Sequence, residues 1–363
     1  MISWGEGMAL RQSMTPIPWW FGMPFRFWRR MRLAPGVTLN LSKSTASLSL
    51  GPRGAKYTIS PRGNRATAGI PGTGLFYTVH DRKRSGRGGN APAPHVPRRD
   101  RLKLGFFQRL LTPAEERRFV DGVRALNDGD HDGALSALEE AEGLADAVWM
   151  AGMIRLRREE FDIARGHFQY ALDRLADLGT LFGKYAIAAQ ASLAITPDIF
   201  AHVFPRERGT RLVLVEIAQL QGRHDEAMAH VERLMEIDPT DPVVLLSFAE
   251  LALDMPQDRS LMDRVVRASA DVANETPVDT AILLYRGKAL AALDLPDAAI
   301  KVLTLANRRR KDRPDALLHQ IRYDRALLYD ETGQRARARQ EFERLYVADP
   351  GFEDVAERVG VGS

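Results

Sequence analysis

Few side chains in this sequence have the types and spacing that chemistry requires. There is no cysteine, which excludes disulfides, zinc–thiolate sites and thiol catalysis. His224 and His230 stand six residues apart, without the H-E-x-x-H spacing that puts two metal ligands on one helical face. The glycine-rich stretch 69–74 lacks the Lys and the Ser/Thr of a phosphate-binding loop, so we interpret it as a turn. We therefore expect no catalytic, cofactor-binding or metal site.

Clustered charge offers a different chemistry, the binding of an anion. Residues 1–103 carry 18 Lys and Arg against three acidic residues, whereas residues 104–363 carry 33 against 44. Such an asymmetry indicates an anionic partner for the front of the chain, or contact between its two halves. Nucleic-acid binding by the front is expected to be weak, salt-dependent and independent of sequence. The candidate anion-binding side chains are Arg26, Arg29, Arg30, Arg32, Lys43, Arg53, Lys56, Arg62, Arg65, Arg82, Lys83, Arg84 and Arg87.

The elements that carry these bases alternate apolar and polar residues with the period of two that is typical of β-strands. Turns rich in Gly and Pro separate the alternating stretches 37–42, 45–50, 55–60, 66–70 and 75–79. We expect a small basic β domain over residues 23–80, followed by a basic Gly/Pro-rich linker over residues 81–103. Residues 1–22 are expected to be a flexible extension; the alternative is an aromatic wedge that enters a membrane interface.

Fixed sequence words recur in order within this β domain. They are F-R-F at 25–27, P-G-V-T-L-N-L-S-K-S at 35–44, G-P-R-G at 51–54 and I-P-G-T-G-L-F-Y at 70–77. In this combination, residues 23–79 resemble a small bacterial domain of unknown function. Thr45 stands where that family usually has Gly, so this hairpin is expected to turn differently. The resemblance implies no activity.

From residue 104 the apolar period becomes helical. In residues 208–239, apolar positions recur on both sides of a break at Gly222, and Pro239 stops the second helix. This pattern is similar to the tetratricopeptide repeat. Repeat starts near 115, 145, 179, 208, 242, 280 and 319 predict about seven helix pairs within residues 104–355.

Three local predictions accompany this helical region. Thr112-Pro113-Ala114-Glu115 predicts a helix start with Thr112 as the N-cap. Residues 177–206 are expected to form a degenerate helix pair, interrupted at Thr196-Pro197 and Pro205. Residues 356–363 are expected to form a frayed tail.

In stacked helix pairs the first helices line the concave side, which is the usual binding surface. From Glu216 onward the predicted lining is mainly acidic, which suits a partner with a basic segment; the alternative is that the groove is acidic only because the whole region is. The Lys, Asn and Arg set with which some members of the repeat family clamp a peptide carboxylate is absent. The candidate groove residues are Trp149, Met153, Arg157, Glu216, Gln219, Glu250, Asp254, Lys288, Tyr323, Leu327 and Asp330.

The sequence thus predicts an α+β protein, a small antiparallel β meander followed by an all-α tetratricopeptide-type solenoid. No apolar run is long enough for a transmembrane segment, and we expect a cytoplasmic protein. The expected function is non-catalytic scaffolding that binds a protein or peptide in the groove. The alternative is nucleic-acid or anionic-surface binding through the basic front. A third expectation is that the basic linker visits the acidic groove; the oligomeric state stays open.

Overall fold

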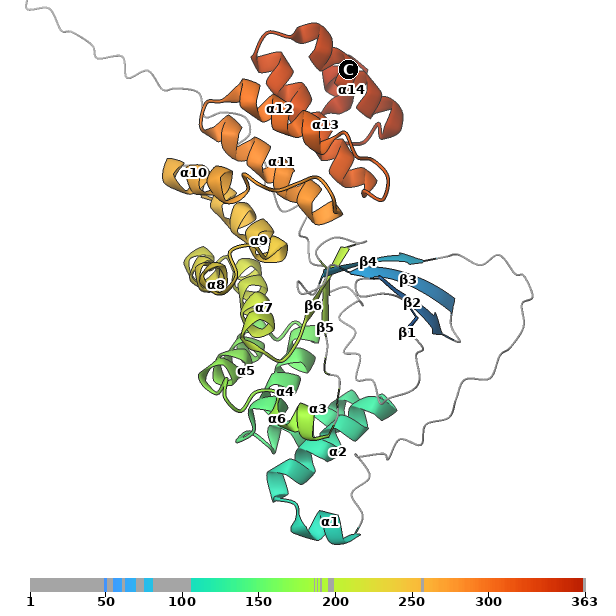
Figure 1. Ribbon diagram of the computed structural model, residues 1–363, viewed down its shortest axis with the longest axis vertical. Helices are drawn as coiled ribbons and strands as arrows, with labels where there is room; N and C mark the ends of the chain where they lie inside the picture. Colours follow the sequence, from blue (N-terminus) through green and yellow to red (C-terminus); the bar gives the residue numbers. More distant parts are fainter. Residues whose placement is uncertain are drawn as a thin grey trace, which may run out of the picture.

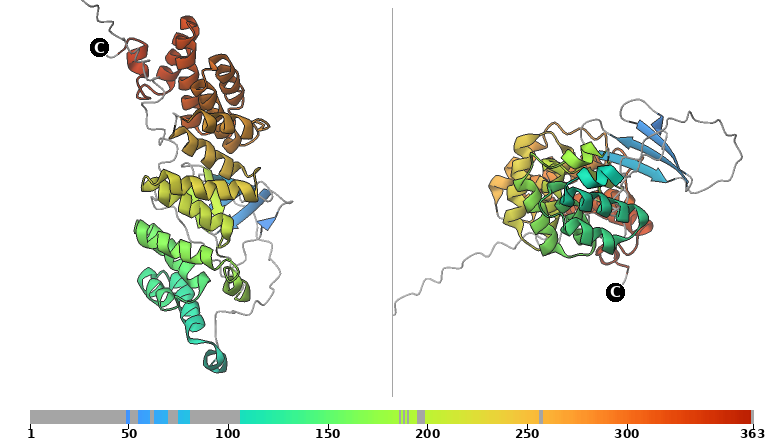
Figure 2. Two further views of the ribbon diagram at one scale, coloured as in Figure 1. Left: turned by 90° about the vertical axis from the view of Figure 1, so that its left-hand side faces the viewer. Right: turned by 90° about the horizontal axis from the view of Figure 1, so that it is seen from below.

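Antiparallel helix pairs, stacked side by side, make up most of the described chain (Figure 1). The computed structural model describes residues 106–185, 187, 189, 191–194, 199–255 and 258–361, and the backbone of residues 49–50, 55–60, 63–69 and 75–80. In the turned view of Figure 2 the pairs follow one another along the long axis. Within the described residues, no helix is both long enough and apolar enough to cross a lipid bilayer.

Six pairs are complete in this part of the chain, and we call their first and second members A and B helices. The A helices are α2 (Ala114–Asp128), α4 (Ala145–Arg157), α7 (Glu207–Leu220), α9 (Pro242–Leu253), α11 (Pro277–Ala292) and α13 (Asp315–Glu331). The B helices are α3 (His131–Glu139), α5 (Phe161–Asp173), α8 (His224–Ile237), α10 (Arg259–Ala268), α12 (Pro296–Ala306) and α14 (Arg335–Ala348). Three short helices, α1 (Phe106–Leu111), α6 (Thr180–Lys184) and α15 (Val355–Arg358), complete the set.

Local sequence fixes several helix starts. Pro277 opens α11, and Thr276 caps it in a capping box: Asp279 N donates to Thr276 Oγ1 at 3.1 Å, and Thr276 N donates to Asp279 Oδ2 at 2.8 Å. Asp241 caps α9 in the same way by accepting from Val243 N at 2.9 Å. These side chains satisfy amides that the first helical turn leaves without partners.

Glycine sets the close approach of A and B helices within a pair. A Cβ on Gly287 of α11 would lie 2.6 Å from Cδ2 of Leu303 on α12. A Cβ on Gly122 of α2 would lie 2.7 Å from Cγ of Leu138 on α3. At both positions a larger side chain would push the helices of the pair apart.

The first predicted helix start needs a correction of one residue. The N-cap of α2 is Pro113, not Thr112, and no side chain caps this end. Instead, the Pro113 carbonyl accepts from Arg117 N at 3.0 Å. The fixed φ of Pro113 suits the cap position as well as the first helical position.

The predicted helix pair over residues 177–206 is wrong. Among the residues of this range that the structure describes, α6 is the helix, and two strands follow it, β5 (Ala191–Ala194) and β6 (Ile199–Val203), paired antiparallel. The segment between the strands contains Pro197, which cannot supply the amide that a continuous helix needs. Asp146 of α4 holds the start of α6 by accepting from Leu181 N at 2.7 Å.

A six-stranded antiparallel sheet lies beside the helices, in the order β1-β2-β3-β4-β6-β5 (Figure 1). Its first four strands are β1 (Ser49–Leu50), β2 (Ala55–Ser60), β3 (Gly63–Gly69) and β4 (Leu75–His80). Gly63 and Asn64, expected in a turn, belong to β3 opposite Ser60 and Ile59. β4 pairs with β6 in a register that sets Phe76 opposite Phe200. The predicted strand at 37–42 lies outside the described residues.

The apolar core runs continuously through the helix pairs. It extends from Phe119 on α2 to Leu328 on α13, and a second cluster around Phe342 closes the C-terminal end. Residues 356–361, which were expected to fray, lie in α15 and the turn after it, where Val361 N donates to Ala356 O at 2.9 Å. Val355 at the start of α15 is fully buried and belongs to the second cluster.

Candidate functional site

Two of the predicted groove residues on α4 lie in the core instead. Trp149 is fully buried, its ring packs edge-on against Phe168, and its Nε1 donates to Thr210 Oγ1 at 3.1 Å. Met153 is 2% exposed. Eleven of the 13 residues of α4 are buried. A helix that is apolar on nearly every side has no polar stripe, so its sequence does not show which side would face a groove.

Tyr323 and Leu327 on α13 are core residues as well. Tyr323 is 3% exposed and packs edge-on against Phe342 and Phe352. Its Oη donates to Asp354 Oδ1 at 2.7 Å, and burial raises the pKa of this phenol well above its usual range. Leu327 is 4% exposed. Tyr323, which was expected to line the groove, therefore packs in the core between α13, α14 and the start of α15.

Arg157 and Asp330 lie at the ends of their helices. Arg157 is exposed at the C-terminus of α4, where its Nη1 lies 3.4 Å from His131 Nε2 at the start of α3. Asp330 is exposed in the last turn of α13. Both therefore mark the edge of the repeats rather than their middle.

The remaining predicted residues are a set of polar side chains on, or directly after, the A helices α7, α9 and α11. We call it the A-helix row; two of its contacts join neighbouring repeats. Tyr285 Oη on α11 donates to Glu250 Oε1 on α9 at 3.5 Å. Lys288 Nζ on α11 lies 3.1 Å from Asp324 Oδ2 on α13. The members of the row are Glu216, Gln219, Glu250, Asp254, Tyr285, Lys288 and Asp324.

Lys288 is the basic residue of this row, and its surroundings perturb it strongly. Its side chain is 11% exposed and that of Asp324 is 13% exposed. Burial lowers the pKa of the Lys288 ammonium, and the Asp324 carboxylate opposes that shift. Burial, with the charges of Asp324 and Asp354, raises the pKa of nearby Glu353. Negative charge therefore outweighs positive charge around Lys288.

Sequence reasoning missed Asp324 and Tyr285. Asp324 follows the buried Tyr323 by one residue, and Tyr285 precedes Lys288 by three, which is one helical turn. Helical position could have identified Tyr285, which shares a helical face with the predicted residue Lys288. Asp324 lies on the next A helix and is the residue that pairs with Lys288.

The two histidines of α8 contact different helices. His224 Nδ1 lies 3.7 Å from Asp254 Oδ2 on α9, whereas His230 Nδ1 lies 3.3 Å from Arg211 Nη1 on α7. They do not converge on one point. Across the part of the chain that the structure describes, no group of ligating side chains could hold a metal ion.

Only two of the predicted anion-binding residues lie in described strands. Lys56 on β2 pairs in register with Thr67, and Arg65 on β3 pairs with Thr58. The others lie outside the described residues: Arg26, Arg29, Arg30, Arg32, Lys43, Arg53, Arg62, Arg82, Lys83, Arg84 and Arg87.

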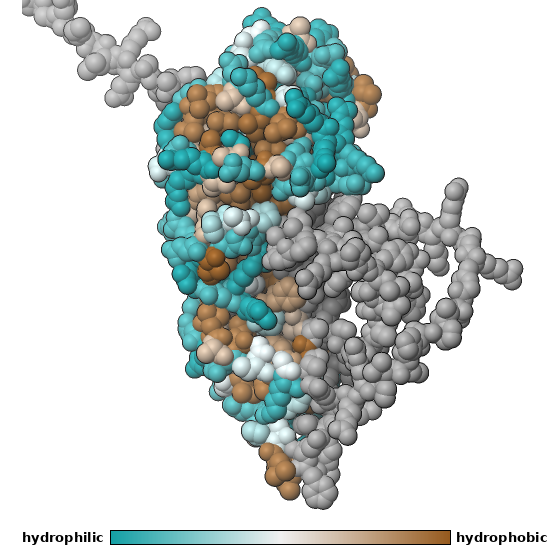
Figure 3. Space-filling model, in the orientation of Figure 1, coloured by the Kyte–Doolittle hydropathy of each residue, from teal (hydrophilic) through white to brown (hydrophobic). Residues whose placement is uncertain are grey.

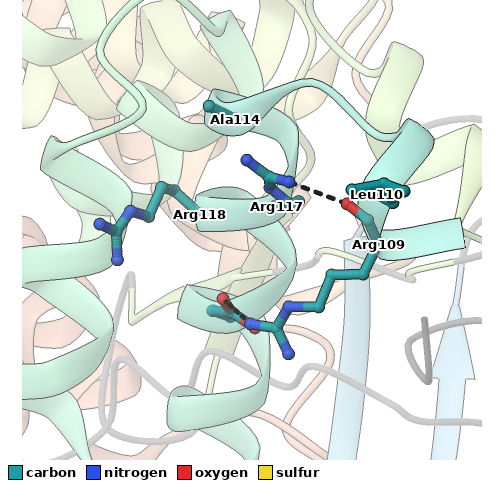
Figure 4. A pocket seen from close by; sticks show the side chains of 6 residues that line it. Arg109, Leu110, Ala114, Arg117 and Arg118 are labelled. Carbon is teal, nitrogen blue, oxygen red and sulfur yellow. Dashed lines mark hydrogen bonds and ion pairs between the residues drawn. The ribbon is translucent and has the colours of Figure 1, made fainter. Parts of the chain in front are cut away.

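An open depression of about 380 Å³ lies between α1 and the start of α2 (Figure 4). Arg109 reaches across it to Asp121 at 2.7 Å, and Arg117 Nη1 donates to the Arg109 carbonyl at 2.9 Å. Arg118 pairs with Glu140 at 2.8 Å. These arginines already have partners within the chain, so the depression offers little unmatched charge to a ligand.

Apolar side chains reach the surface in several places on the face shown in Figure 3. One brown area covers α11 and its neighbours in the upper part of the solenoid, and a smaller one lies at the lower end near α1. In α1, Leu110 is 70% exposed and Leu111 is 84% exposed. Leu110 lines the depression of Figure 4.

Comparison with known proteins gave two kinds of match. Residues 25–78 match the model of a family described as "Protein of unknown function (DUF4236)". Among solved structures, the C-terminal part of a repeat-containing protein from Cytophaga hutchinsonii is 14% identical, with 67% of this chain and 88% of that chain covered and a TM-score of 0.43. The assembly chaperone Acl4 of RpL4 is 12% identical (68% and 95% covered; TM-score 0.41). MamA is 20% identical (42% and 79% covered; TM-score 0.35). No curated protein matches the chain.

The spacing of the A helices decides the class of repeat. α7, α9 and α11 begin at Glu207, Pro242 and Pro277, which are 35 residues apart, and each is followed by one antiparallel B helix. A helix–turn–helix unit of about 34 residues defines the tetratricopeptide repeat. The helical part is a tetratricopeptide-type α-solenoid. Between α5 and α7 this solenoid carries a hairpin in place of a helix pair.

Proposed function

We propose that this protein is a non-catalytic scaffold in the cytoplasm, whose solenoid binds a protein partner along the A-helix row. The favoured ligand is a peptide segment with Lys or Arg side chains. In this proposal residues 23–80 form a basic β domain, whose strand β4 pairs with β6 of the helical region, with residues 1–22 as an extension and residues 81–103 as a linker. The tetratricopeptide-type solenoid supports the scaffold part of the proposal, because stacked repeats present one continuous surface.

The charge of the A-helix row is the observation that carries the peptide part of the proposal. Four carboxylates, from Glu216, Glu250, Asp254 and Asp324, stand with one lysine on helices α7 to α13. Glu216 and Glu250 are each 5% exposed. Glu250 accepts a hydrogen bond from Tyr285 within the chain, so the support comes from the excess of negative charge along the row, which a basic peptide segment would complement.

The test uses the full-length chain and two labelled peptides of equal length, one rich in Lys and Arg and one rich in Asp and Glu. Fluorescence anisotropy should show binding of the basic peptide alone. Replacing Glu250 by Gln and Asp254 by Asn together should weaken it by about tenfold or more, because two charge-assisted contacts are lost. Glu343→Gln is the matched control: Glu343 is an exposed acid of α14 that pairs with Arg339. Equal affinity for both peptides, or an unchanged affinity in the double variant, would refute the proposal.

A second candidate function is the binding of nucleic acid or another anionic surface by the front of the chain. Residues 23–80 contain nine Lys and Arg and no acidic residue, and residues 81–103 add eight more. Anisotropy with labelled DNA should then show affinity that falls steeply with salt, since each neutralised phosphate releases counterions. Replacing Arg82, Lys83, Arg84 and Arg87 by Gln should reduce both the affinity and its salt slope. No binding at low salt would remove this candidate.

The linker is also a candidate ligand for the A-helix row of its own chain. A tether of this length gives an effective concentration of roughly millimolar, and exposed opposite charges add a salt-screened attraction. Small-angle scattering should then show a radius of gyration that grows between low and high salt. In the Glu250→Lys, Asp254→Lys double variant the growth should disappear. A radius that ignores both salt and charge reversal would show that the linker does not dock.

A further inference from the structure

A cluster of arginines lies between the last helix pairs, on the side of α13 away from the A-helix row. Arg325 on α13 reaches both neighbouring B helices: its Nη1 donates to Thr304 Oγ1 on α12 at 3.4 Å, and its Nη2 lies 2.9 Å from Glu341 Oε1 on α14. Arg344 Nη1, one turn along α14, donates to the same Glu341 oxygen at 3.4 Å. One carboxylate oxygen therefore serves two guanidinium groups.

The bottom of this cluster is buried and incompletely satisfied. The side chains of Arg325 and Glu341 are 8% and 9% exposed. Arg325 Nε and Glu341 Oε2 are buried without a hydrogen-bond partner. Buried polar groups of this kind are rare in folded proteins, and each one calls for an explanation such as a bound ion or water.

Two further arginines add positive charge at shallower depth. Arg322 lies one helical turn before Arg325 and is half-buried, and Arg310 is exposed on the loop between α12 and α13. Neither side chain makes a hydrogen bond or a close ion pair with any residue that the structure describes. Burial and the charges of Arg310, Arg325 and Arg344 lower the pKa of Arg322, whereas Glu341 opposes that shift.

Two other arginines of the loop between α12 and α13 differ from Arg310, because their side chains have partners within the chain. Arg309 Nη1 donates to the carbonyls of Asn274 and Glu275 at 3.2 and 3.1 Å, and Arg313 Nε donates to Thr280 Oγ1 at 2.6 Å. Those two side chains hold the loop against α11. Arg310, between them in sequence, is left at the rim beside Arg322.

We propose that this arginine cluster, formed by Arg310, Arg322, Arg325 and Arg344, binds a phosphate group. Two of the four arginines contact Glu341, the one acid of the cluster, so a dianion matches the excess positive charge better than a single carboxylate does. Guanidinium groups bind phosphate through paired N–H donors, and the unpartnered Nε–H of Arg325 at the base of the cluster suits an oxyanion. The phosphate belongs either to a small phosphorylated molecule or to a phosphorylated side chain of a partner protein. The cluster is independent of the peptide proposal, because it lies on the B-helix side.

The experiment measures thermal unfolding of the full-length protein in sodium phosphate and in sodium chloride of equal ionic strength. Phosphate should raise the Tm by about 2 °C or more above chloride, because a ligand that binds only the folded state stabilises it. Isothermal titration with inorganic phosphate, a phosphoserine peptide and the same peptide without phosphate then separates the sources. Tighter binding of the phosphopeptide than of inorganic phosphate assigns the site to a phosphorylated partner, and the reverse order assigns it to a small molecule.

Two variants separate the cluster from the basic front of the chain. Arg322→Gln and Arg310→Gln should each weaken phosphate binding about tenfold, since each loses a charge-assisted contact. Arg339→Gln, which removes an exposed arginine of α14 that pairs with Glu343, is the matched control and should bind as the wild type does. Arg322→Gln should also raise the Tm without phosphate, because it removes repulsion. Equal Tm values in phosphate and chloride, or wild-type affinity in both variants, would overturn the proposal; exposed Arg310 keeps the test valid even if Arg322→Gln does not fold.

Discussion

Helix α13 contributes residues to both the A-helix row and the arginine cluster. Unlike charges are paired in the row, whereas like charges gather in the cluster. In the row, Lys288 of α11 meets Asp324 of α13 at 3.1 Å, so unlike charges pair across a repeat boundary. In the cluster, Arg322 and Arg325 stand beside Arg344 around the single carboxylate of Glu341. Asp324 and Arg325 are adjacent in sequence, yet a helix turns by about 100° per residue, which sends them to different neighbours.

The difference shows how one solenoid can present two unlike surfaces. Helix α11 contacts the A helices α9 and α13 as well as the B helices α10 and α12, so one helix carries more than one row of contacts. The net charge of the whole helical region is negative, but it describes neither surface. The charge near each surface therefore has to be read from the residues that meet there.

The largest expected effect comes from removing the one acid of the cluster. Glu341→Gln should destabilise the fold by about 3 kcal/mol, because breaking a buried ion pair leaves Arg325 charged and unpaired. Urea unfolding at pH 7 measures this change. Phosphate should restore part of the loss, since it would replace the missing negative charge.

Glu343→Gln is the control for that measurement. Glu343 lies on the same helix but is 53% exposed, so its loss should change stability by less than about 0.5 kcal/mol. If Glu341→Gln and Glu343→Gln changed the free energy of unfolding equally, the Glu341 ion pair would stabilise the fold no more than an exposed pair does. The contrast between the cluster and the row would then be wrong.

The row should respond less strongly to the loss of its lysine. Lys288→Met should cost about 2 kcal/mol, below the range for a fully buried pair, because Asp324 keeps a hydrogen bond from Gln320 Nε2 at 2.8 Å. Replacing both Lys288 and Asp324 by apolar residues should recover most of this loss. Urea unfolding of the single and double variants gives the comparison, with exposed Lys301→Met as the control.

The smallest effect is a pH dependence from a third site where positive charges approach each other. Burial and the charge of Arg211 lower the pKa of His230 below its usual value of about 6.5. The unfolded chain therefore binds this proton first as the pH falls, and stability should decline from pH 7 towards the lowered pKa.

Urea unfolding between pH 7 and pH 5 tests the histidine. The His230→Asn variant should lose less stability over this range than the wild type does, whereas exposed His131→Asn should follow the wild type. Parallel curves for the wild type and His230→Asn would mean that the contact with Arg211 does not disfavour the imidazolium.

The sequence predicted the helix pairs well where local rules act. The repeat starts predicted near 115, 145, 208, 242, 280 and 319 lie within four residues of the starts of α2, α4, α7, α9, α11 and α13, because apolar periodicity is a local property. The spacing of about 34 residues then identified the class of repeat. The same rules failed at residues 191–203, where two short apolar runs pair as β5 and β6, because runs of four or five residues have no distinguishable period.

The sequence by itself determined that this chain stacks helix pairs and that its charge is divided, because periodicity, prolines, glycines and net charge are local properties. Only the tertiary structure decided which polar residues meet. Trp149 was predicted to line a groove but lies in the core. Because α4 is buried on nearly every side, its hydrophobic pattern does not show which side faces outward. Arg325 and Glu341 carry no signal in sequence, yet they meet at 2.9 Å because α13 and α14 pack as a pair. The positions of charges relative to one another depend on helix rotation and packing, which no single segment specifies.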